Sequence, residues 1–221
     1  MDILERLRGG LVVSCQPVDN GPMDDPAIVA AMAQAAVAGG AVGLRIEGVE
    51  NLKATRGKVN VPIIGIVKRD LTNTDVRITP FIRDAEALID EGADIVGYDA
   101  TNRSRPDPKE AVLQMILSAG KLAMADCSTL EDAREAVAQG ASIVGSTLSG
   151  YVGENASSTT PPDFALLSQL SKLDAFVMAE GRYNTPEYAR EAIAAGADSV
   201  TIGSALTRLE IATSWFVDAL K

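Results

Sequence analysis

A Gly-Ala phrase between a helix-like stretch and a short apolar run occurs four times in this sequence. It reads GGAVGLRI from residue 39, EGADIVGYD from 91, QGASIVGST from 139 and AGADSVTIG from 195. The glycine is a helix stop and the apolar run after it is a strand. The glycines at 40, 92, 140 and 196 lie 52, 48 and 56 residues apart, so each interval holds two strand–helix units. Four such intervals predict an α/β fold, a single (β/α)8 TIM barrel.

Short apolar runs between amphipathic stretches support this count. Strands that are covered by helices and buried on both faces have this pattern. The 221 residues, 47% of them hydrophobic, suffice for the core of one such domain over residues 1–221. Because similar units continue on both sides of the Ser-, Thr- and Pro-rich stretch 153–162, we interpret it as a long loop. The predicted strands are 11–15, 42–46, 62–67, 95–98, 122–125, 143–146, 175–179 and 199–202.

A doubly wound open sheet is the competing fold. Such a sheet usually carries a glycine-rich phosphate loop after its first strand, whereas this chain reads SCQPVDNGPM there. The sequence therefore favours the barrel. The last helix-like segment, 205–220, contains Trp215 and Phe216, which we expect to pack on the barrel, with a subunit contact as the alternative.

Charge and hydropathy exclude two classes of partner. The formal net charge of −10 would repel polyphosphate, and the 20 Lys and Arg residues are scattered along the chain. Nucleic acid is therefore not expected as a partner. No apolar stretch approaches the roughly 18 residues that cross a bilayer, so we expect no membrane association and a cytoplasmic protein.

The chain contains two cysteines and no histidine. Cys15 and Cys127 end apolar runs without a metal-ligand spacing, which predicts buried, reduced thiols. The absence of histidine removes the commonest zinc ligand and the commonest general base. Acid/base chemistry must then fall to Lys, Asp, Glu, Tyr or Cys, and we expect no metal ion.

Polar residues follow the predicted strands. Active sites of β/α barrels are built from the carboxyl ends of the strands, so these residues are the candidates for chemistry. They are Gln16, Arg45 with Glu47, Lys68 with Arg69 and Asp70, Asp99, Asp126, Thr147 with Ser149, Glu180 with Arg182, and Gly203 with Ser204.

The last two units have the character of a phosphate site. Gly181 and Arg182 follow the seventh strand, and Gly203 and Ser204 follow the eighth. Glycines permit close backbone approach, and the segment offers N–H donors and a guanidinium to an anion. Arg208 lies one turn further on. Strands seven and eight are where barrels of this kind frequently bind phosphate.

Lys68 ends the run PIIGIVK and should emerge into the barrel mouth. Burial and neighbouring cations such as Arg45 or Arg69 would lower its pKa from about 10.4 towards neutrality, which suits a general base. A nearby carboxylate such as Glu180 or Asp126 would instead favour the ammonium form, a proton donor or electrostatic stabiliser. The sequence leaves both roles open.

Motifs along essentially the whole chain resemble one family, the N-acylmannosamine-6-phosphate 2-epimerases, also called N-acylglucosamine-6-phosphate 2-epimerases. The stretch 153–162 is the part that does not match closely, and it affects loop shape more than chemistry. The matching segments are SCQP with GPM, GLRIEG, PIIGIVKRD, VRITPF, the DAT of GYDAT, MADCST, TLSGY, AEGRYNTP and TIGSALTRLE.

The resemblance implies an epimerase that inverts C2 of N-acetylmannosamine 6-phosphate to give N-acetylglucosamine 6-phosphate, a step in sialic acid breakdown. It implies a barrel that needs no redox cofactor. Lys68 matches the family's acid/base lysine and Glu180 its catalytic glutamate. The positions that line the sugar are Gln16, Arg45 and Asp126, and those that bind phosphate are Gly181, Arg182, Gly203, Ser204 and Arg208.

The implied reaction removes and returns the C2 proton, which is α to the C1 aldehyde of the open-chain sugar. That step needs stabilisation of the enolate charge, for which Arg45 is the candidate. Glu180 would orient Lys68, assist ring opening or act as a second acid/base. The expected partner is a small sugar phosphate. The sequence leaves the oligomeric state open, and a homodimer is the first expectation.

Two other classes use similar features. A Schiff-base aldolase or lyase on a phosphorylated keto sugar would need the same barrel, phosphate site and buried lysine, and borohydride would trap substrate on Lys68. A non-catalytic sugar-phosphate sensor would bind tightly without turnover.

Overall fold

Eight parallel strands close into a barrel in the computed structural model, which describes residues 2–153, 156 and 161–221. Each strand pairs with the next, and the first pairs with the last through Leu11↔Val200 to Val13↔Ile202. This closure confirms the predicted barrel and excludes the open sheet. The strands are β1 (Leu11–Cys15), β2 (Gly43–Glu47), β3 (Ile63–Ile66), β4 (Ile95–Asp99), β5 (Leu122–Asp126), β6 (Ile143–Gly145), β7 (Phe176–Glu180) and β8 (Ser199–Ile202).

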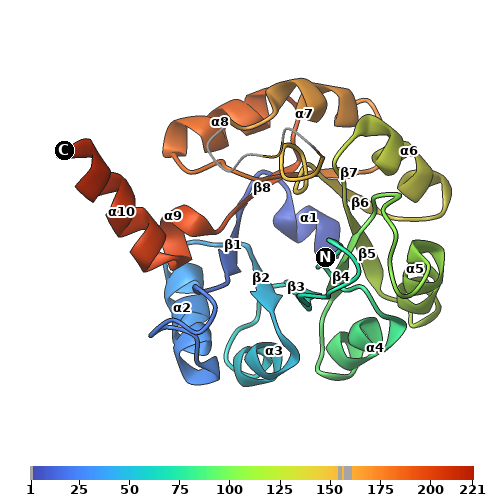
Figure 1. The fold of residues 1–221 in the computed structure, drawn as a ribbon, viewed down its shortest axis with the longest axis horizontal. Helices are drawn as coiled ribbons and strands as arrows, with labels where there is room; N and C mark the ends of the chain where they lie inside the picture. Colours follow the sequence, from blue (N-terminus) through green and yellow to red (C-terminus); the bar gives the residue numbers. More distant parts are fainter. Residues whose placement is uncertain (1, 154–155, 157–160) are drawn as a thin grey trace.

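Helices follow every strand and surround the barrel, as Figure 1 shows. A short helix that the sequence did not predict, α1 (Ile3–Leu7), precedes β1. The others are α2 (Pro26–Ala38), α3 (Val49–Arg56), α4 (Ile82–Asp90), α5 (Lys109–Ser118), α6 (Leu130–Ala138), α7 (Phe164–Leu170), α8 (Pro186–Ala194), α9 (Ser204–Thr207) and α10 (Leu209–Ala219).

The repeated glycines end helices at the amino-terminal side of the barrel. Gly40, Gly92, Gly140 and Gly196 have φ angles of 101°, 90°, 106° and 102°. Glycine adopts this left-handed region without the steric cost of a Cβ atom, so the chain turns at once into the next strand. The interpretation of the repeat is confirmed.

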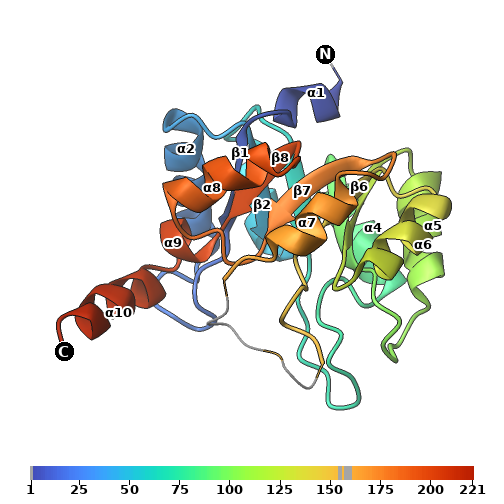
Figure 2. The same ribbon diagram turned by 90° about the horizontal axis from the view of Figure 1, so that it is seen from above.

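The barrel interior changes from apolar to polar along its axis. Its amino-terminal half holds a buried apolar cluster closed from outside by Leu7 of α1, on the far side from the strand-end loops (Figure 2). Side chains of the same parity further along the strands are polar, so the polar half faces the loops. The cluster comprises Leu7, Val12, Ile64, Ile95, Met124, Ile143, Phe176 and Met178.

The C-terminal helix α10 does not pack on the barrel. It has no buried residue, and Trp215, Phe216 and Leu220 are 39%, 74% and 88% exposed. Both ribbon views show it extending away from the ring of helices (Figures 1 and 2). The expectation that Trp215 and Phe216 pack on the barrel is therefore wrong. The helix turns away at Arg208 (φ −104°, ψ 77°), where α9 ends.

For two sequence-based expectations, the loop 153–162 and the absence of a membrane span, the structure can be compared only over the described residues. Most of the stretch 153–162 lies outside the described residues, so its prediction as a loop stands untested. No helix in the described part is long and apolar enough to span a membrane.

Candidate active site

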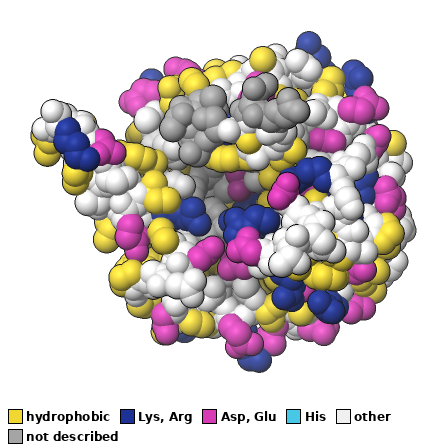
Figure 3. Space-filling view, viewed as in Figure 1, with side chains coloured by type: hydrophobic (Ala, Val, Ile, Leu, Met, Phe, Trp, Pro, Cys, Tyr) yellow, Lys and Arg dark blue, Asp and Glu magenta, His cyan; other side chains and the backbone are white. Residues whose placement is uncertain are grey.

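A cavity of about 390 Å³ opens at the carboxyl ends of the strands. Figure 3 looks into this end, where basic and acidic side chains surround a hollow. Two predicted site residues, Arg45 and Asp126, are almost fully buried beside it. The other eight line the cavity: Gln16, Lys68, Glu180, Gly181, Arg182, Gly203, Ser204 and Arg208.

A buried ion-pair network crosses the barrel beneath the cavity. The Nη2 atom of Arg45 donates to Asp126 Oδ2 at 2.6 Å, and Nη1 lies 3.3 Å from Oδ1. The Nε atom of Arg45 lies 3.3 Å from Glu180 Oε1. Thr147 Oγ1 donates to Asp126 Oδ1 at 2.6 Å. A guanidinium without water needs such partners, and these carboxylates supply them from strands far apart in the sequence.

Glu180 is the second carboxylate on one guanidinium. Burial raises the pKa of Glu180 to about 7, although the Arg45 cation opposes this shift and Asp126 adds to it. Its Oε2 atom is buried without a hydrogen-bond partner. A carboxyl group whose pKa lies near neutrality is suited to acid/base chemistry.

Lys68 follows β3 and lines the same cavity, above the buried network. Its Nζ donates to Gln16 Oε1 at 2.5 Å, and the Gln16 amide donates to Ser14 Oγ at 2.5 Å. Burial, followed by the charges of Arg208 and Arg45, lowers the pKa of Lys68 to about 8, while Glu47 opposes this. The sequence left the direction of the Lys68 pKa shift open, and in the structure the pKa is lowered. The second neighbouring cation is Arg208, whereas the sequence suggested Arg69.

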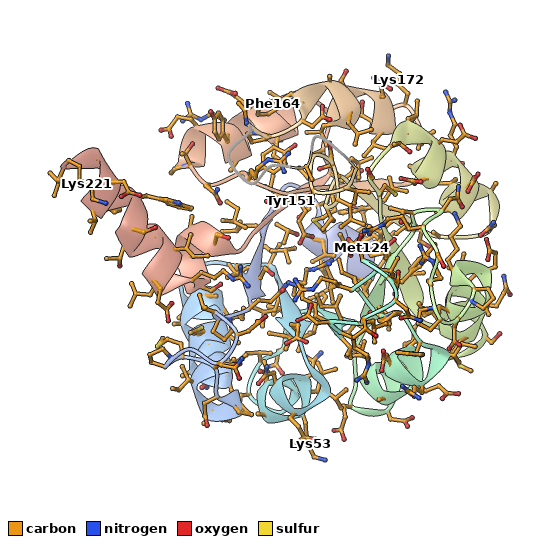
Figure 4. The ribbon with its side chains drawn as sticks, viewed as in Figure 1. Lys53, Met124, Tyr151, Phe164, Lys172 and Lys221 are labelled. Atoms are coloured by element: carbon orange, nitrogen blue, oxygen red, sulfur yellow. The ribbon has the colours of Figure 1, made fainter. Side chains whose placement is uncertain are left out.

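The chain after β7 turns through two residues with positive φ. Gly181 has φ 104° and Arg182 has φ 64°. The Arg182 guanidinium stacks over the Tyr151 ring at 4.6 Å, and its Nε donates to the Pro161 carbonyl at 3.3 Å. In Figure 4, Tyr151, on which Arg182 stacks, lies inside the ring of helices, as does Met124. Lys53, Lys172 and Lys221 lie outside the ring. The turn holds an arginine at the cavity.

The residues after β8 complete this basic side of the cavity. Arg208 Nε donates to the Gln16 carbonyl at 3.1 Å, which fixes its guanidinium beside the mouth. Gly203 lies close against β1, because an added Cβ would be 3.3 Å from the Cβ of Ser14. Arg182 and Arg208 thus line the cavity together with Gly181 and Gly203, and phosphate binding by these residues stays a prediction.

Some strand-end candidates lie elsewhere. Arg69 turns away to Asp84, with Nε 2.9 Å from Oδ2. Asp70 is an exposed partner of Arg77. Glu47 accepts from the Lys68 backbone N–H at 3.0 Å and is not part of the cavity lining.

A second charged cluster was seen only in part from the sequence. Asp99, fully buried at the end of β4, pairs with Arg103 at 2.5 Å and Arg105 at 3.0 Å. Asp99 and Arg103 line the cavity, together with Asp75 and Arg77 of the loop after β3. The strand end indicated Asp99. Arg77 lies in the matching segment VRITPF, but no sequence pattern assigned it or Asp75 to the cavity, because their place depends on how the loop folds back.

Ser14, Thr201 and Tyr183 are among the lining residues that the sequence analysis missed. Ser14 lies two positions before Gln16 on β1, and Thr201 two positions before Gly203 on β8. The twofold alternation of strands would have found them, because residues two apart share a face. Tyr183 directly follows Arg182, and its ring packs edge-on against Phe164 at 5.6 Å.

Both cysteines are free and buried, as predicted. Burial raises the pKa of Cys15 to about 12 and that of Cys127 well above its usual value. Neither thiol is a nucleophile at neutral pH. In the described part of the chain no three His, Cys, Asp or Glu side chains are placed to hold a metal ion.

A closed parallel barrel with Lys68 and Glu180 at the strand ends, and with two arginines beside glycine turns, defines the class of (β/α)8-barrel enzymes. Residues 29–221 match the family model described as "Putative N-acetylmannosamine-6-phosphate epimerase". The chain belongs to this family of epimerases.

Similar proteins agree over the whole length. The chain is 59% identical over 219 residues to a "Putative N-acetylmannosamine-6-phosphate 2-epimerase" of Pasteurella multocida, covering 99% of this chain and 95% of the relative. It is 58% identical to a Haemophilus influenzae protein of the same description, covering 100% and 96%. The solved N-acetylmannosamine-6-phosphate 2-epimerase of Clostridium perfringens is 36% identical, with a TM-score of 0.94 over 99% and 96% of the two chains.

A more distant structure shares the fold alone. A thiamine phosphate pyrophosphorylase of Pyrococcus furiosus has a TM-score of 0.63 at 18% identity.

Proposed function

We propose that the protein inverts C2 of N-acetylmannosamine 6-phosphate to give N-acetylglucosamine 6-phosphate by removing and returning the C2 proton. The observation that carries this proposal is the pair of ionisable groups at one cavity, with the pKa of Glu180 raised to about 7 and that of Lys68 lowered to about 8. Two groups that exchange protons near neutral pH suit a reversible proton transfer at carbon. In bacteria this step belongs to sialic acid breakdown.

Lys68 is the proposed proton shuttle at C2. As a neutral amine it would take the proton from one face of C2. The new proton must reach the other face, either from Glu180 or from the Lys68 ammonium after the planar enolate has turned in the site. Gln16 holds the Lys68 Nζ in place through its 2.5 Å hydrogen bond. Glu180 supplies the second acid/base group, and the sugar site also includes Asp126.

Arg45 is the proposed stabiliser of the enolate. Its Nε is buried without a hydrogen-bond partner, 3.3 Å from Glu180 Oε1. A fixed cation in a site shielded from water stabilises developing negative charge more strongly than one in water. Asp126 keeps the guanidinium in position through its two contacts.

The substrate's phosphate is proposed to lie between β7 and β8, held by Arg182, Arg208 and the backbone at Gly181, Gly203 and Ser204. Both arginines line the cavity that Lys68 and Glu180 share. Anchoring a remote group lets its binding energy position the reacting carbon.

Independence of metal and of redox cofactors is part of the proposal. The reaction exchanges a proton without net oxidation, and Lys68, Glu180 and Arg45 together supply the acid/base groups and the charge stabilisation. We also propose a cytoplasmic location, which the two free, buried cysteines support.

A homodimer is the proposed assembly. The exposed apolar side chains of α10 include Leu209, Trp215 and Phe216. An apolar hollow of about 330 Å³ lies beside α9, over β1 and α2, and Leu11, Met32 and Leu206 are among its lining residues. An apolar helix and an apolar hollow on one chain are complementary between two copies.

The function is tested with N-acetylmannosamine 6-phosphate in D2O, followed at C2 by NMR in the presence of a chelator. Conversion to the gluco epimer with deuterium at C2 is expected, because the proton taken by Lys68 or Glu180 exchanges with solvent. The Lys68→Met variant should be folded and lose at least about 1,000-fold in rate, the upper part of the range for an acid/base group.

Three results would contradict the proposal. If folded protein shows no conversion and no exchange at C2, the proposed reaction is wrong. Loss of activity with chelator, restored by a divalent metal, would overturn the metal independence. Borohydride attachment of substrate to Lys68 would establish the Schiff-base lyase in its place.

A further inference from the structure

Buried polar atoms without hydrogen-bond partners are concentrated at the cavity. Among the described residues there are six such side-chain atoms, and only Thr55 Oγ1 lies away from the site. The other five belong to Arg45, Glu180, Arg182, Tyr183 and Thr201. An unpaired buried polar group costs about 1–3 kcal/mol, so a protein retains it where it has another use.

Thr201 is the one of these five whose hydroxyl points into the barrel without a role so far. Its register partners on the flanking strands are Glu180 on β7 and Val12 on β1. Glu180 reaches Arg45 across the barrel, and Val12 belongs to the interior cluster. Residues in register on neighbouring parallel strands share a face, so Thr201 is inward as well. It is 2% exposed and lines the cavity.

The surroundings of Thr201 define what its hydroxyl can bind. The adjacent Glu180 side chain leaves Oε2 unpartnered, and Arg45 leaves Nε unpartnered at 3.3 Å from Glu180 Oε1. Neighbouring strands lie about 4.8 Å apart, so the side chains of Thr201 and Glu180 leave the barrel wall next to each other. A hydroxyl both donates and accepts, which suits a sugar oxygen better than an apolar group.

We propose that Thr201 is a substrate-binding residue whose hydroxyl bonds a sugar oxygen next to the reacting carbon, on the Glu180 side of the cavity. This inference rests on the proposed epimerase function. It adds a neutral group on β8, deeper in the barrel than Gly203 and Ser204, to the charged groups that hold the substrate. No described protein group bonds this hydroxyl, so it is free to bond a substrate oxygen in the cavity.

Two substitutions at this position separate binding from structure. Thr201→Val keeps the shape of the side chain and removes the hydroxyl, whereas Thr201→Ser keeps the hydroxyl. We expect Thr201→Val to lower kcat/KM about 10- to 100-fold, the loss of one hydrogen bond to substrate. Thr201→Ser should stay within about threefold of the wild type. The Tm of Thr201→Val should equal or exceed that of the wild type, because an unpaired buried hydroxyl has been removed.

Thr55→Val is the matched control. It removes the same buried, unpartnered group from α3, away from the cavity, and should leave kcat/KM unchanged. Wild-type activity on N-acetylmannosamine 6-phosphate is measured first, so a wild type that does not turn over overturns the proposed function and this inference with it. With an active wild type, an equally active Thr201→Val overturns only the role of Thr201. A Tm of Thr201→Val clearly below that of Thr55→Val would also overturn it, since the hydroxyl would then support the fold.

Discussion

At Glu180, stability and chemistry are opposed. The side chain is 12% exposed, and burial raises its pKa to about 7. The folded protein therefore holds this proton more tightly than the unfolded chain does, and the stability from the neutral carboxyl is lost as pH rises through 7. Above that pH the molecule carries two buried carboxylates on the single guanidinium of Arg45, an arrangement suited to taking a proton.

We expect Glu180→Gln to be more stable than the wild type at pH 8, by about 2 kcal/mol, because glutamine never ionises and Asp126 still pairs with Arg45. The difference should shrink towards zero at pH 5, where Glu180 is neutral in the folded protein. Urea unfolding at both pH values measures this. The variant should also lose most of its epimerase activity.

Glu135→Gln should change the stability at pH 8 in the opposite direction to Glu180→Gln. The hydrogen bond from Lys109 lowers the pKa of Glu135, so this carboxylate stabilises the folded protein at neutral pH and the stabilisation is lost as pH falls. Its glutamine variant should be destabilised at pH 8. If both variants shift stability in the same direction, the assignment of a raised pKa to Glu180 is wrong.

At the scale of elements, the turn between β7 and α8 positions the proposed phosphate site. Gly181 at φ 104° and Arg182 at φ 64° reverse the chain so that the guanidinium lies over Tyr151. With negative φ angles at these two positions, the chain would leave β7 in another direction and the Arg182 side chain would point elsewhere. If the turn binds phosphate as proposed, its positive φ values serve that function as well as the fold.

Gly181→Ala should raise KM at least tenfold, because a Cβ atom strains the backbone at φ 104° and the relaxing turn displaces Arg182. The loss of stability should be about 1–2 kcal/mol. Gly40→Ala is the matched control, since Gly40 has φ 101° with no atom within 4 Å of the added Cβ and lies at the opposite end of the barrel. Steady-state kinetics and urea unfolding are measured on both. Equal stability losses with unchanged KM in both variants would show that the turn does not position the substrate.

At the scale of the whole molecule, the barrel closes its amino-terminal end and leaves its carboxyl-terminal end open. Leu7 of α1 completes the interior apolar cluster, while the polar half of the interior opens into the cavity. One element remains outside this arrangement, because α10 buries none of its residues against its own barrel.

The proposed dimer predicts that Phe216→Asp combined with Leu220→Asp yields a monomer. These side chains are 74% and 88% exposed, so the substitutions cost the isolated chain little but place charge in an apolar interface. Sedimentation velocity at micromolar concentration measures the result. Ile193→Asp, on α8 and 38% exposed, is the control and should remain dimeric. A wild type that sediments as a monomer would contradict the assembly.

What the sequence determined by itself was the order of the eight units and the identity of the strand-end residues. Alternation of apolar runs with glycine stops is a local property, and parallel strands in a closed barrel must bring their carboxyl ends to one side, as with Gln16, Lys68 and Glu180. Predicted strand bounds differ from the observed ones by a residue or so at either end. The resemblance to the epimerases was local as well, since it rested on short motifs.

Only the tertiary structure decided which of these residues pair and what their charges do. Arg45 and Asp126 are 81 residues apart, and nothing local in either segment specifies their pairing. The pKa of Lys68 depends on burial and on the distances to Arg208 and Arg45, which are set by barrel closure. The same holds for α10, whose apolar face has the pattern of a packed helix. Whether it packs depends on the direction in which the chain leaves the barrel at Arg208.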